Sequence, residues 1–252
     1  MARHATQARH ATEAMKTLLL TGATGFVGRN VLLHELRQGT RIFAPVRNPE
    51  KLHDQLLGEG LATDSVTPLP PDPSKWSGVD PTHAILSAGV LFARDRASYF
   101  KVNVDWTWEI LQALPETCRT VVLSSQSAGG PTPDGQLARS ETHADAPVTW
   151  YGESKLELEQ RIRRDFPSKK IAILRPPMIL GARDKATLPL FQMGTKLIRT
   201  KPGWRKKEFS FIAVEDLITA ISAAFELESR GPFYLCSDQK ISDFDLIETA
   251  AQ

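Results

Sequence analysis

A tyrosine and a lysine four residues apart, Tyr151 and Lys155, are the residues of this chain best suited to proton transfer. Residues at this spacing lie one turn apart on the same face of an α-helix. An isolated phenol has a pKa of about 10, too high for acid–base work at neutral pH, and a nearby ammonium favours the phenolate and lowers that pKa. The pair could therefore act as a tuned proton donor or acceptor. The same spacing is also common on ordinary amphipathic helices.

A serine cluster follows an apolar run, Thr120–Leu123, that we expect to form a strand. In open α/β sheets, ligands bind beyond the carboxyl ends of the strands. A hydroxyl at this place could therefore hold a carbonyl oxygen near the tyrosine. Ser125 is the preferred candidate, and Ser124 and Ser127 are alternatives. The other interpretation is a serine-rich turn that only caps the strand.

A glycine motif, Gly22, Gly25 and Gly28, lies between the apolar run Leu18–Leu20 and a segment of helical periodicity, Val27–Arg37. A strand, a glycine-rich turn and a helix in this order form a site for the pyrophosphate of a dinucleotide. The glycines permit a tight backbone, and the helix offers free N–H groups and its positive dipole end to the anion. The residues expected to contact the dinucleotide here are Thr21, Gly22, Thr24, Gly25, Phe26, Val27 and Gly28.

The residue after the second expected strand indicates which dinucleotide binds. An acidic residue there would bind the adenosine ribose hydroxyls and select NAD. This chain has Arg47 instead, and its planar cationic group suits the 2′-phosphate of NADP(H). Lys51 is a second candidate for that phosphate. We therefore expect NADPH to be preferred over NADH, although Arg47 could also be a solvated loop residue.

Short apolar strands alternate with amphipathic helices, which predicts an α/β fold with a doubly wound parallel sheet of the Rossmann type. The expected strands are Leu18–Leu20, Arg41–Val46, Val66–Leu69, Ala84–Leu86, Thr120–Leu123 and Ile171–Leu174. The expected helices are Val27–Arg37, Tyr99–Leu114 and Tyr151–Phe166. We expect a disordered N-terminal extension (1–14), an NAD(P)-binding domain (15–174), and a small substrate lobe (175–252) interleaved with the sheet domain. This lobe is either naturally small or truncated.

Composition narrows the class of protein. The 252 residues carry a formal net charge of +2, too small to argue for nucleic-acid or membrane binding. The two cysteines, Cys118 and Cys236, have no metal-ligand spacing and form no disulfide framework. We therefore expect a cytoplasmic location and no bound metal. Residues 1–14 hold a short polar duplication, and Met15 reads like a natural start.

Taken together, these residues resemble the extended branch of the short-chain dehydrogenase/reductase superfamily, the NAD(P)-dependent epimerase/dehydratase family. The glycine spacing, Ser125 and the Tyr151–Lys155 pair carry the resemblance. Val46–Pro49 is similar to a segment of dihydroflavonol-reductase-like members, which use NADPH. The further matching segments are Val102–Val104, Leu174–Gly181 and Phe211–Leu217. The resemblance is specific for the fold and much less specific for the substrate.

The resemblance implies catalytic roles for four residues. Tyr151 would be the catalytic acid/base, and Lys155 would bind the nicotinamide ribose and depress the pKa of the tyrosine. Ser125 would polarise the substrate carbonyl. Asn103 would support a proton relay or a helix bend, and a helix-cap asparagine is the equal alternative.

The resemblance also implies further contacts with the cofactor. Asp72 stands where the family often has an aspartate that contacts adenine, although a turn aspartate explains it as well. Ser87 and Pro176 are also expected at the cofactor. Many relatives dimerise through helices of the sheet domain, so a homodimer is a further expectation.

Two residues help to choose among the reactions of this branch. Dehydratases carry an extra acid and base beside the central hydroxyl, whereas Gln126 and Ser127 stand there in this chain. We favour reduction of a ketone or aldehyde of a small molecule, with hydride from NADPH and a proton from Tyr151. One alternative is a nucleotide-sugar epimerase-like enzyme. Another is a non-catalytic NADP-binding redox sensor or assembly protein, although such relatives often lose the tyrosine or lysine.

Overall fold

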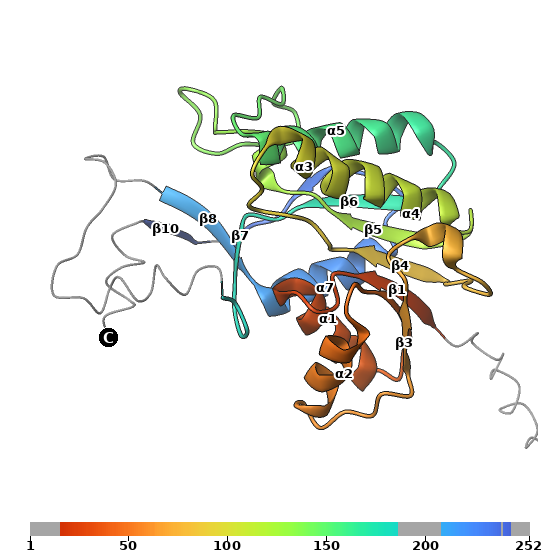
Figure 1. Ribbon diagram of the computed structural model, residues 1–252. Coiled ribbons are helices and arrows are strands. Elements are labelled where there is room, and N and C mark those ends of the chain that lie inside the picture. The colour runs from red at the N-terminus through yellow and green to blue at the C-terminus, as the bar shows by residue number, and fades with distance from the viewer. Residues whose placement is uncertain (1–15, 186–207, 238, 243–252) are drawn as a thin grey trace, which may run out of the picture.

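The computed structural model describes residues 16–185, 208–237 and 239–242, so the expected extension at 1–14 and Met15 lie outside the described residues. The main sheet has seven parallel strands in the order β3-β2-β1-β4-β5-β6-β9 (Figure 1). This arrangement confirms the predicted doubly wound parallel sheet. The strands are β1 Thr17–Thr21, β2 Arg41–Pro45, β3 Val66–Leu69, β4 His83–Leu86, β5 Arg119–Leu123, β6 Ile171–Arg175 and β9 Phe233–Tyr234.

Helices cover both faces of this sheet. Leu18 and Leu20 of β1 pack in one core with residues of α1 (Phe26–Arg37), α2 (Pro49–Leu57) and α7 (Val214–Ala224). Leu19 points to the opposite face, because successive side chains of a strand alternate. Its core includes residues of α4 (Thr107–Ala113) and α5 (Trp150–Asp165), and Figure 1 shows the two helix layers on either side of the sheet. Burial on both faces explains why the strands are continuous apolar runs.

The helical stretch expected at 99–114 differs from the prediction in its winding and its start. It consists of α3 (Arg96–Phe100), a π-helical segment η2 (Lys101–Trp106) and α4. Asp95 caps α3 by accepting a hydrogen bond from the backbone N–H of Ser98, at 2.8 Å. A π-helical segment adds a bulge to an α-helix, and such bulges are frequent at functional sites.

The C-terminal part of the chain is divided between two sheets. A three-stranded sheet combines β7 (Met178–Leu180), β8 (Glu208–Ala213) and β10 (Lys240–Ser242). In contrast, α7 packs in the core below the main sheet (Figure 1). Strand β9 pairs with β6 at the edge of that sheet. The expected substrate lobe therefore shares its residues with the sheet domain.

Helix α2 was missing from the predicted elements, although it has a clear start. The side chain of Asn48 accepts a hydrogen bond from the Lys51 N–H at 2.9 Å, and Pro49 occupies the first helical position. Pro45 is tolerated in β2 because it is the last residue of the strand. Across the described residues, no helix combines the length and apolar character needed to cross a membrane.

Candidate active site

The glycine turn between β1 and α1 is closed by backbone contacts that leave no room for side chains. Gly22 has a φ of +75°, and a Cβ there would stand 3.1 Å from the backbone of Ala88. A Cβ on Gly28 would lie 2.1 Å from the carbonyl oxygen of Gly22. Helix α1 begins after Gly25 with no side-chain cap and no acidic residue in its first turn. Its first N–H groups therefore remain available to an anion, and the turn fits a dinucleotide pyrophosphate.

Two of the predicted cofactor residues join β1 to the loop after β4. The Ser87 hydroxyl donates to the Thr21 carbonyl oxygen at 2.6 Å, and the Thr21 hydroxyl accepts from the Ala88 N–H at 3.0 Å. Thr21 is buried. These bonds fix the spacing of the two strand ends at the edge where the glycine turn lies.

Asn103 connects the same loop to helix α5. Its side chain is fully buried within η2, and it both accepts from the Val90 N–H at 2.8 Å and donates to the Val90 carbonyl at 3.2 Å. It also donates to the Ser154 hydroxyl at 3.0 Å. Asn103 is therefore not a helix cap, because its amide is used between elements. A Cβ on Gly89 would meet Asn103 Oδ1 at 3.1 Å and Lys155 Nζ at 3.3 Å, so sequence reasoning overlooked a glycine beside the site.

Tyr151 and Lys155 lie one turn apart on α5, with Lys155 Nζ 5.9 Å from the centroid of the phenol ring. The Lys155 ammonium is buried and donates to the Leu123 carbonyl at 2.9 Å. Burial lowers the pKa of Lys155 to about 8, against the opposing charge of Glu159. Burial also raises the pKa of Tyr151, and a hydrogen bond with Ser125 opposes that shift without cancelling it.

The two adjacent serines after β5 have different partners. Ser125 accepts a hydrogen bond from the Ser127 N–H at 3.1 Å, and its hydroxyl is close enough to the Tyr151 phenol to oppose the rise in the pKa of that phenol. Ser124 donates instead to the buried carboxylate of Glu159. Of the three candidate hydroxyls, that of Ser125 is therefore beside the tyrosine in this structure.

A buried arginine, Arg175, holds the elements around these serines together. It lies at the end of β6 and is 1% exposed. Its guanidinium donates to Glu159 of α5 at 2.9 and 2.7 Å and to Asp145, which precedes α5, at 2.7 and 2.9 Å. It also donates to the Tyr234 hydroxyl of β9 at 2.8 Å. Burial disfavours the charge of Arg175, but the hydrogen bonds with Asp145 and Glu159 outweigh it and raise its pKa.

Sequence reasoning did not include this arginine cluster in the site. One signal was available, because Glu159 follows Lys155 by four residues and so extends the same helix face by one turn. The contacts with Asp145 and Tyr234 join segments 30 and 59 residues from Arg175, and no local pattern encodes them.

The remaining predicted cofactor residues lie around the same end of the sheet. Arg47 is exposed and lies two residues after the end of β2. Asp72 lies beyond β3, and its carboxylate accepts from the Ser74 N–H and hydroxyl at 3.0 and 2.7 Å, as a turn aspartate would. The carbonyl of Pro176, just after β6, accepts from the Gln126 N–H at 3.0 Å.

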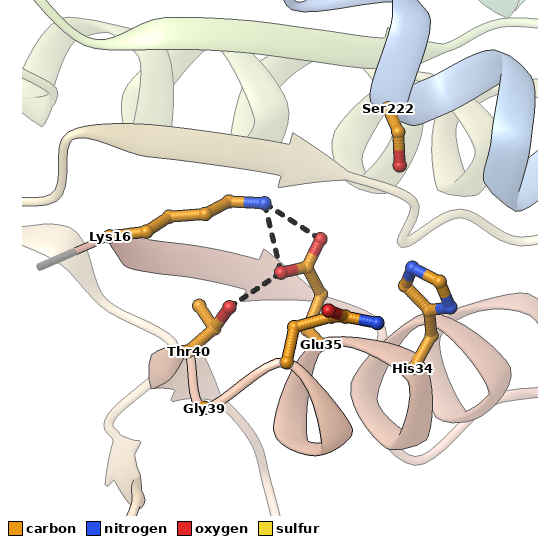
Figure 2. Close-up of a pocket in the computed structure, with 7 residues that line it drawn as sticks. Lys16, His34, Glu35, Gly39, Thr40 and Ser222 are labelled. Carbon is orange, nitrogen blue, oxygen red and sulfur yellow. Dashed lines mark hydrogen bonds and ion pairs between the residues drawn. The ribbon is translucent and has the colours of Figure 1, made fainter.

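A surface hollow of about 360 Å³ lies at the opposite end of β1 and contains none of the predicted site residues. Figure 2 shows Lys16, just before β1, paired with Glu35 of α1 at 2.9 Å. Thr40 donates to the same carboxylate at 2.7 Å. The charged and polar groups of this hollow therefore pair with one another. The hollow lies at the amino ends of the strands, whereas ligands of such sheets bind at the carboxyl ends.

The comparison with protein families agrees with this geometry. The model of the NAD dependent epimerase/dehydratase family matches residues 18–234, which is most of the chain. The chain belongs to the NAD-dependent epimerase/dehydratase family. Members of this family use NAD(P), and this chain is an NAD(P)-dependent enzyme of the oxidoreductase type.

Two curated relatives are named as reductases. A protein of Synechocystis sp. named "Putative dihydroflavonol 4-reductase" is 26% identical over 240 residues, which cover 88% of this chain and 68% of that protein. The "Ceramide reductase" of Caulobacter vibrioides is 29% identical over 190 residues, which cover 74% of this chain and 53% of that protein. The chain thus spans between half and about two thirds of the length of these relatives.

Two solved structures, of an epimerase and of an enzyme with bound NAD, share the fold. UDP-glucose 4-epimerase from Thermotoga maritima has a TM-score of 0.78 and 16% identity, with 93% of this chain and 81% of that chain covered. The Bordetella bronchiseptica enzyme WbmG, solved in complex with NAD, has a TM-score of 0.76 and 18% identity, with 96% and 79% covered. At these identities, the likeness concerns the Rossmann-type fold.

Proposed function

We propose that this protein is an NADPH-dependent reductase of a ketone or aldehyde, with Tyr151 as the proton donor. The observation that carries the proposal is the grouping of the Tyr151 phenol, the Ser125 hydroxyl and the Lys155 ammonium beyond the end of β5. These groups come from two elements that meet at the edge of the sheet where the glycine turn also lies. This combination suits acid–base work beside a bound dinucleotide.

The surroundings of each side chain support its role. Burial raises the pKa of Tyr151, so the phenol is protonated at neutral pH and can donate its proton to a carbonyl oxygen. The Ser125 hydroxyl lies beside the same phenol and can hold that oxygen. One N–H of the Lys155 ammonium donates to the Leu123 carbonyl, and the others can donate to the ribose hydroxyls of the cofactor. NADPH, when bound, supplies the hydride.

We infer that Arg47 selects NADPH over NADH. It is exposed two residues after the end of β2, and the helix that follows begins at Pro49 with its start capped by Asn48. A guanidinium at this place can bind the 2′-phosphate through two parallel hydrogen bonds, and an N-terminal helix end adds favourable potential. Asp72 is a weaker candidate for adenine, because its carboxylate already bonds Ser74.

The surface near Tyr151 supports a substrate with apolar parts. The exposed side chains include Leu91 (55%), Phe92 (86%) and Trp150 (50%). Tyr99 donates to the Leu91 carbonyl at 3.1 Å, and its ring lies 6.4 Å from that of Tyr151. Apolar side chains bind apolar groups of a ligand by removing them from water. The reductase names of the two curated relatives also favour reduction over epimerisation.

A substrate screen tests the proposal. Absorbance of NADPH is followed with purified protein and three sets of compounds: aromatic or aliphatic ketones and aldehydes, small polar carbonyl compounds, and nucleotide sugars. We expect NADPH oxidation with members of the first set. Epimerised nucleotide sugar without net consumption of NADPH would instead identify an epimerase, and NADPH binding without turnover of any compound would favour the non-catalytic alternative.

A further inference from the structure

We propose that Glu159 is a positioning residue of the active site, which holds Lys155 in its charged form and turns Ser124 away so that Ser125 faces Tyr151. The inference rests on the proposed function only for the tasks assigned to Tyr151, Ser125 and Lys155. None of the expected catalytic, cofactor or substrate contacts includes Glu159.

The geometry around Glu159 joins it to the catalytic elements on two sides. It lies on α5 one turn after Lys155 and two turns after Tyr151, and its side chain is fully buried. One carboxylate oxygen accepts from both the Ser124 hydroxyl and Arg175 Nε. The Ser124 hydroxyl is thereby directed to Glu159, whereas the hydroxyl of the next residue, Ser125, lies beside the Tyr151 phenol.

Two buried positive groups, the Arg175 guanidinium and the Lys155 ammonium, lie beside the buried carboxylate of Glu159. Arg175 is positive, and it faces two carboxylates, those of Glu159 and Asp145, at 2.7 to 2.9 Å. The buried Lys155 supplies the second positive charge beside Glu159. A buried charge is costly unless a partner neutralises it, so the pairing favours the ammonium form of Lys155. Arg163 lies at the rim, with its guanidinium 3.7 Å from Glu159.

The groups that face Lys155 come from three elements. Tyr151 and Glu159 face it from α5, the Leu123 carbonyl from β5, and the neutral amide of Asn103 from η2. Among the described residues, Glu159 is the group whose charge supports the ammonium, against the effect of burial. Loss of the carboxylate should therefore make Lys155 release its proton at lower pH.

An NMR titration tests this directly and needs no substrate. Lysine side chains are labelled with ¹³C at Cε, and the Lys155 resonance is identified by its absence in the Lys155→Arg variant. We expect the unmodified protein to titrate at about pH 8. In Glu159→Gln, which keeps the shape of the side chain, we expect the midpoint to fall by about one pH unit.

The matched control is Asp145→Asn, which removes the other carboxylate from the same guanidinium; the hydrogen bonds found for the Asp145 side chain among the described residues are those from Arg175. We expect its midpoint to equal that of the unmodified protein. Equal midpoints in Glu159→Gln and the unmodified protein, or equal shifts in both variants, would overturn the proposal. Should Glu159→Gln fail to fold, Glu159→Asp retains the charge and should titrate as the unmodified protein does; a fall of one unit there would overturn it too. Because the titration involves no carbonyl compound, its result is independent of the proposed reductase activity.

Discussion

Burial, more than the neighbouring ammonium, sets the protonation of the tyrosine. The sequence suggested that Lys155 would lower the pKa of Tyr151, but the ring is enclosed enough that burial raises it. The same effect lowers the pKa of Lys155 to about 8. Desolvation disfavours the charged form of either group, so it moves the two pKa values in opposite directions. The resulting neutral phenol suits a proton donor, which is the form that carbonyl reduction requires.

The pH dependence of reduction follows from this arrangement. Lys155 is charged below its pKa of about 8 and neutral above it. The charged form is the one that we expect to bind the ribose of the cofactor and to lie beside the phenol during reduction. We expect kcat/KM for carbonyl reduction to be constant at neutral pH and to fall above about pH 8. Steady-state rates over a series of buffers measure this profile. A rate that still rises beyond pH 9, about one unit above that pKa, would contradict it.

A substitution at Arg47 should reverse the choice of cofactor. In Arg47→Asp a carboxylate would repel the 2′-phosphate and accept the ribose hydroxyls of NADH instead. Charged hydrogen bonds of about 1.5 to 3 kcal/mol are lost, so NADPH affinity should fall roughly tenfold to 100-fold. Fluorescence titration with each cofactor measures this, with Arg41→Asp at the other end of β2 as the control. Equal binding of NADPH and NADH by the unmodified protein would show that Arg47 selects neither.

At the scale of elements, periodic apolar runs were enough to predict the first six strands of the main sheet. Local cues were weaker where the chain departs from regular winding, as in η2, or where a helix is short, as in α2. Asn48 and Pro49 together are typical of a helix start, so they indicated α2 where the apolar pattern alone did not. The short strands β7 and β9 are defined by partners far along the chain.

Some residues of the site could be predicted from local sequence motifs, whereas others could not. The glycine turn, Ser125, Tyr151 and Lys155 each stand in a motif a few residues long, and the structure brings the last three together. The arginine cluster could not be predicted as a unit, because its hydrogen bonds depend on how β6, β9 and the segment before α5 meet in space.

The glycine turn offers a test at this scale. In Gly28→Ala the new methyl would stand 2.1 Å from the Gly22 carbonyl oxygen, so the backbone of the turn must move. We expect a loss of about 1 to 3 kcal/mol in the free energy of unfolding and loss of NADPH binding. Gly58→Ala, at a right-handed helical position after α2, is the control. Denaturant unfolding and fluorescence titration measure the two effects, and unchanged NADPH binding in Gly28→Ala would exclude this turn as the pyrophosphate site.

At the scale of the whole molecule, one edge of the sheet brings together residues from β1, β2, β4, β5 and β6. A cofactor that contacts several of these strand ends at once binds the folded chain and not the unfolded one. Binding should therefore stabilise the fold by about 2.7 kcal/mol at a concentration 100 times the Kd. We expect NADPH to raise the Tm by more than NADH at equal concentration, as measured by thermal denaturation. An equal increase with both cofactors would argue against discrimination by the folded protein.

The most direct test of the central claim is the Tyr151→Phe variant, which removes one oxygen atom from the site and keeps the aromatic ring. NADPH binding and carbonyl reduction are measured side by side on the variant and the unmodified protein, with a compound that the unmodified protein reduces. We predict that NADPH affinity stays within about twofold, while kcat falls by roughly 10² to 10⁴, the usual worth of a general acid. Reduction at an unchanged rate in Tyr151→Phe would contradict the assignment of Tyr151 as the proton donor.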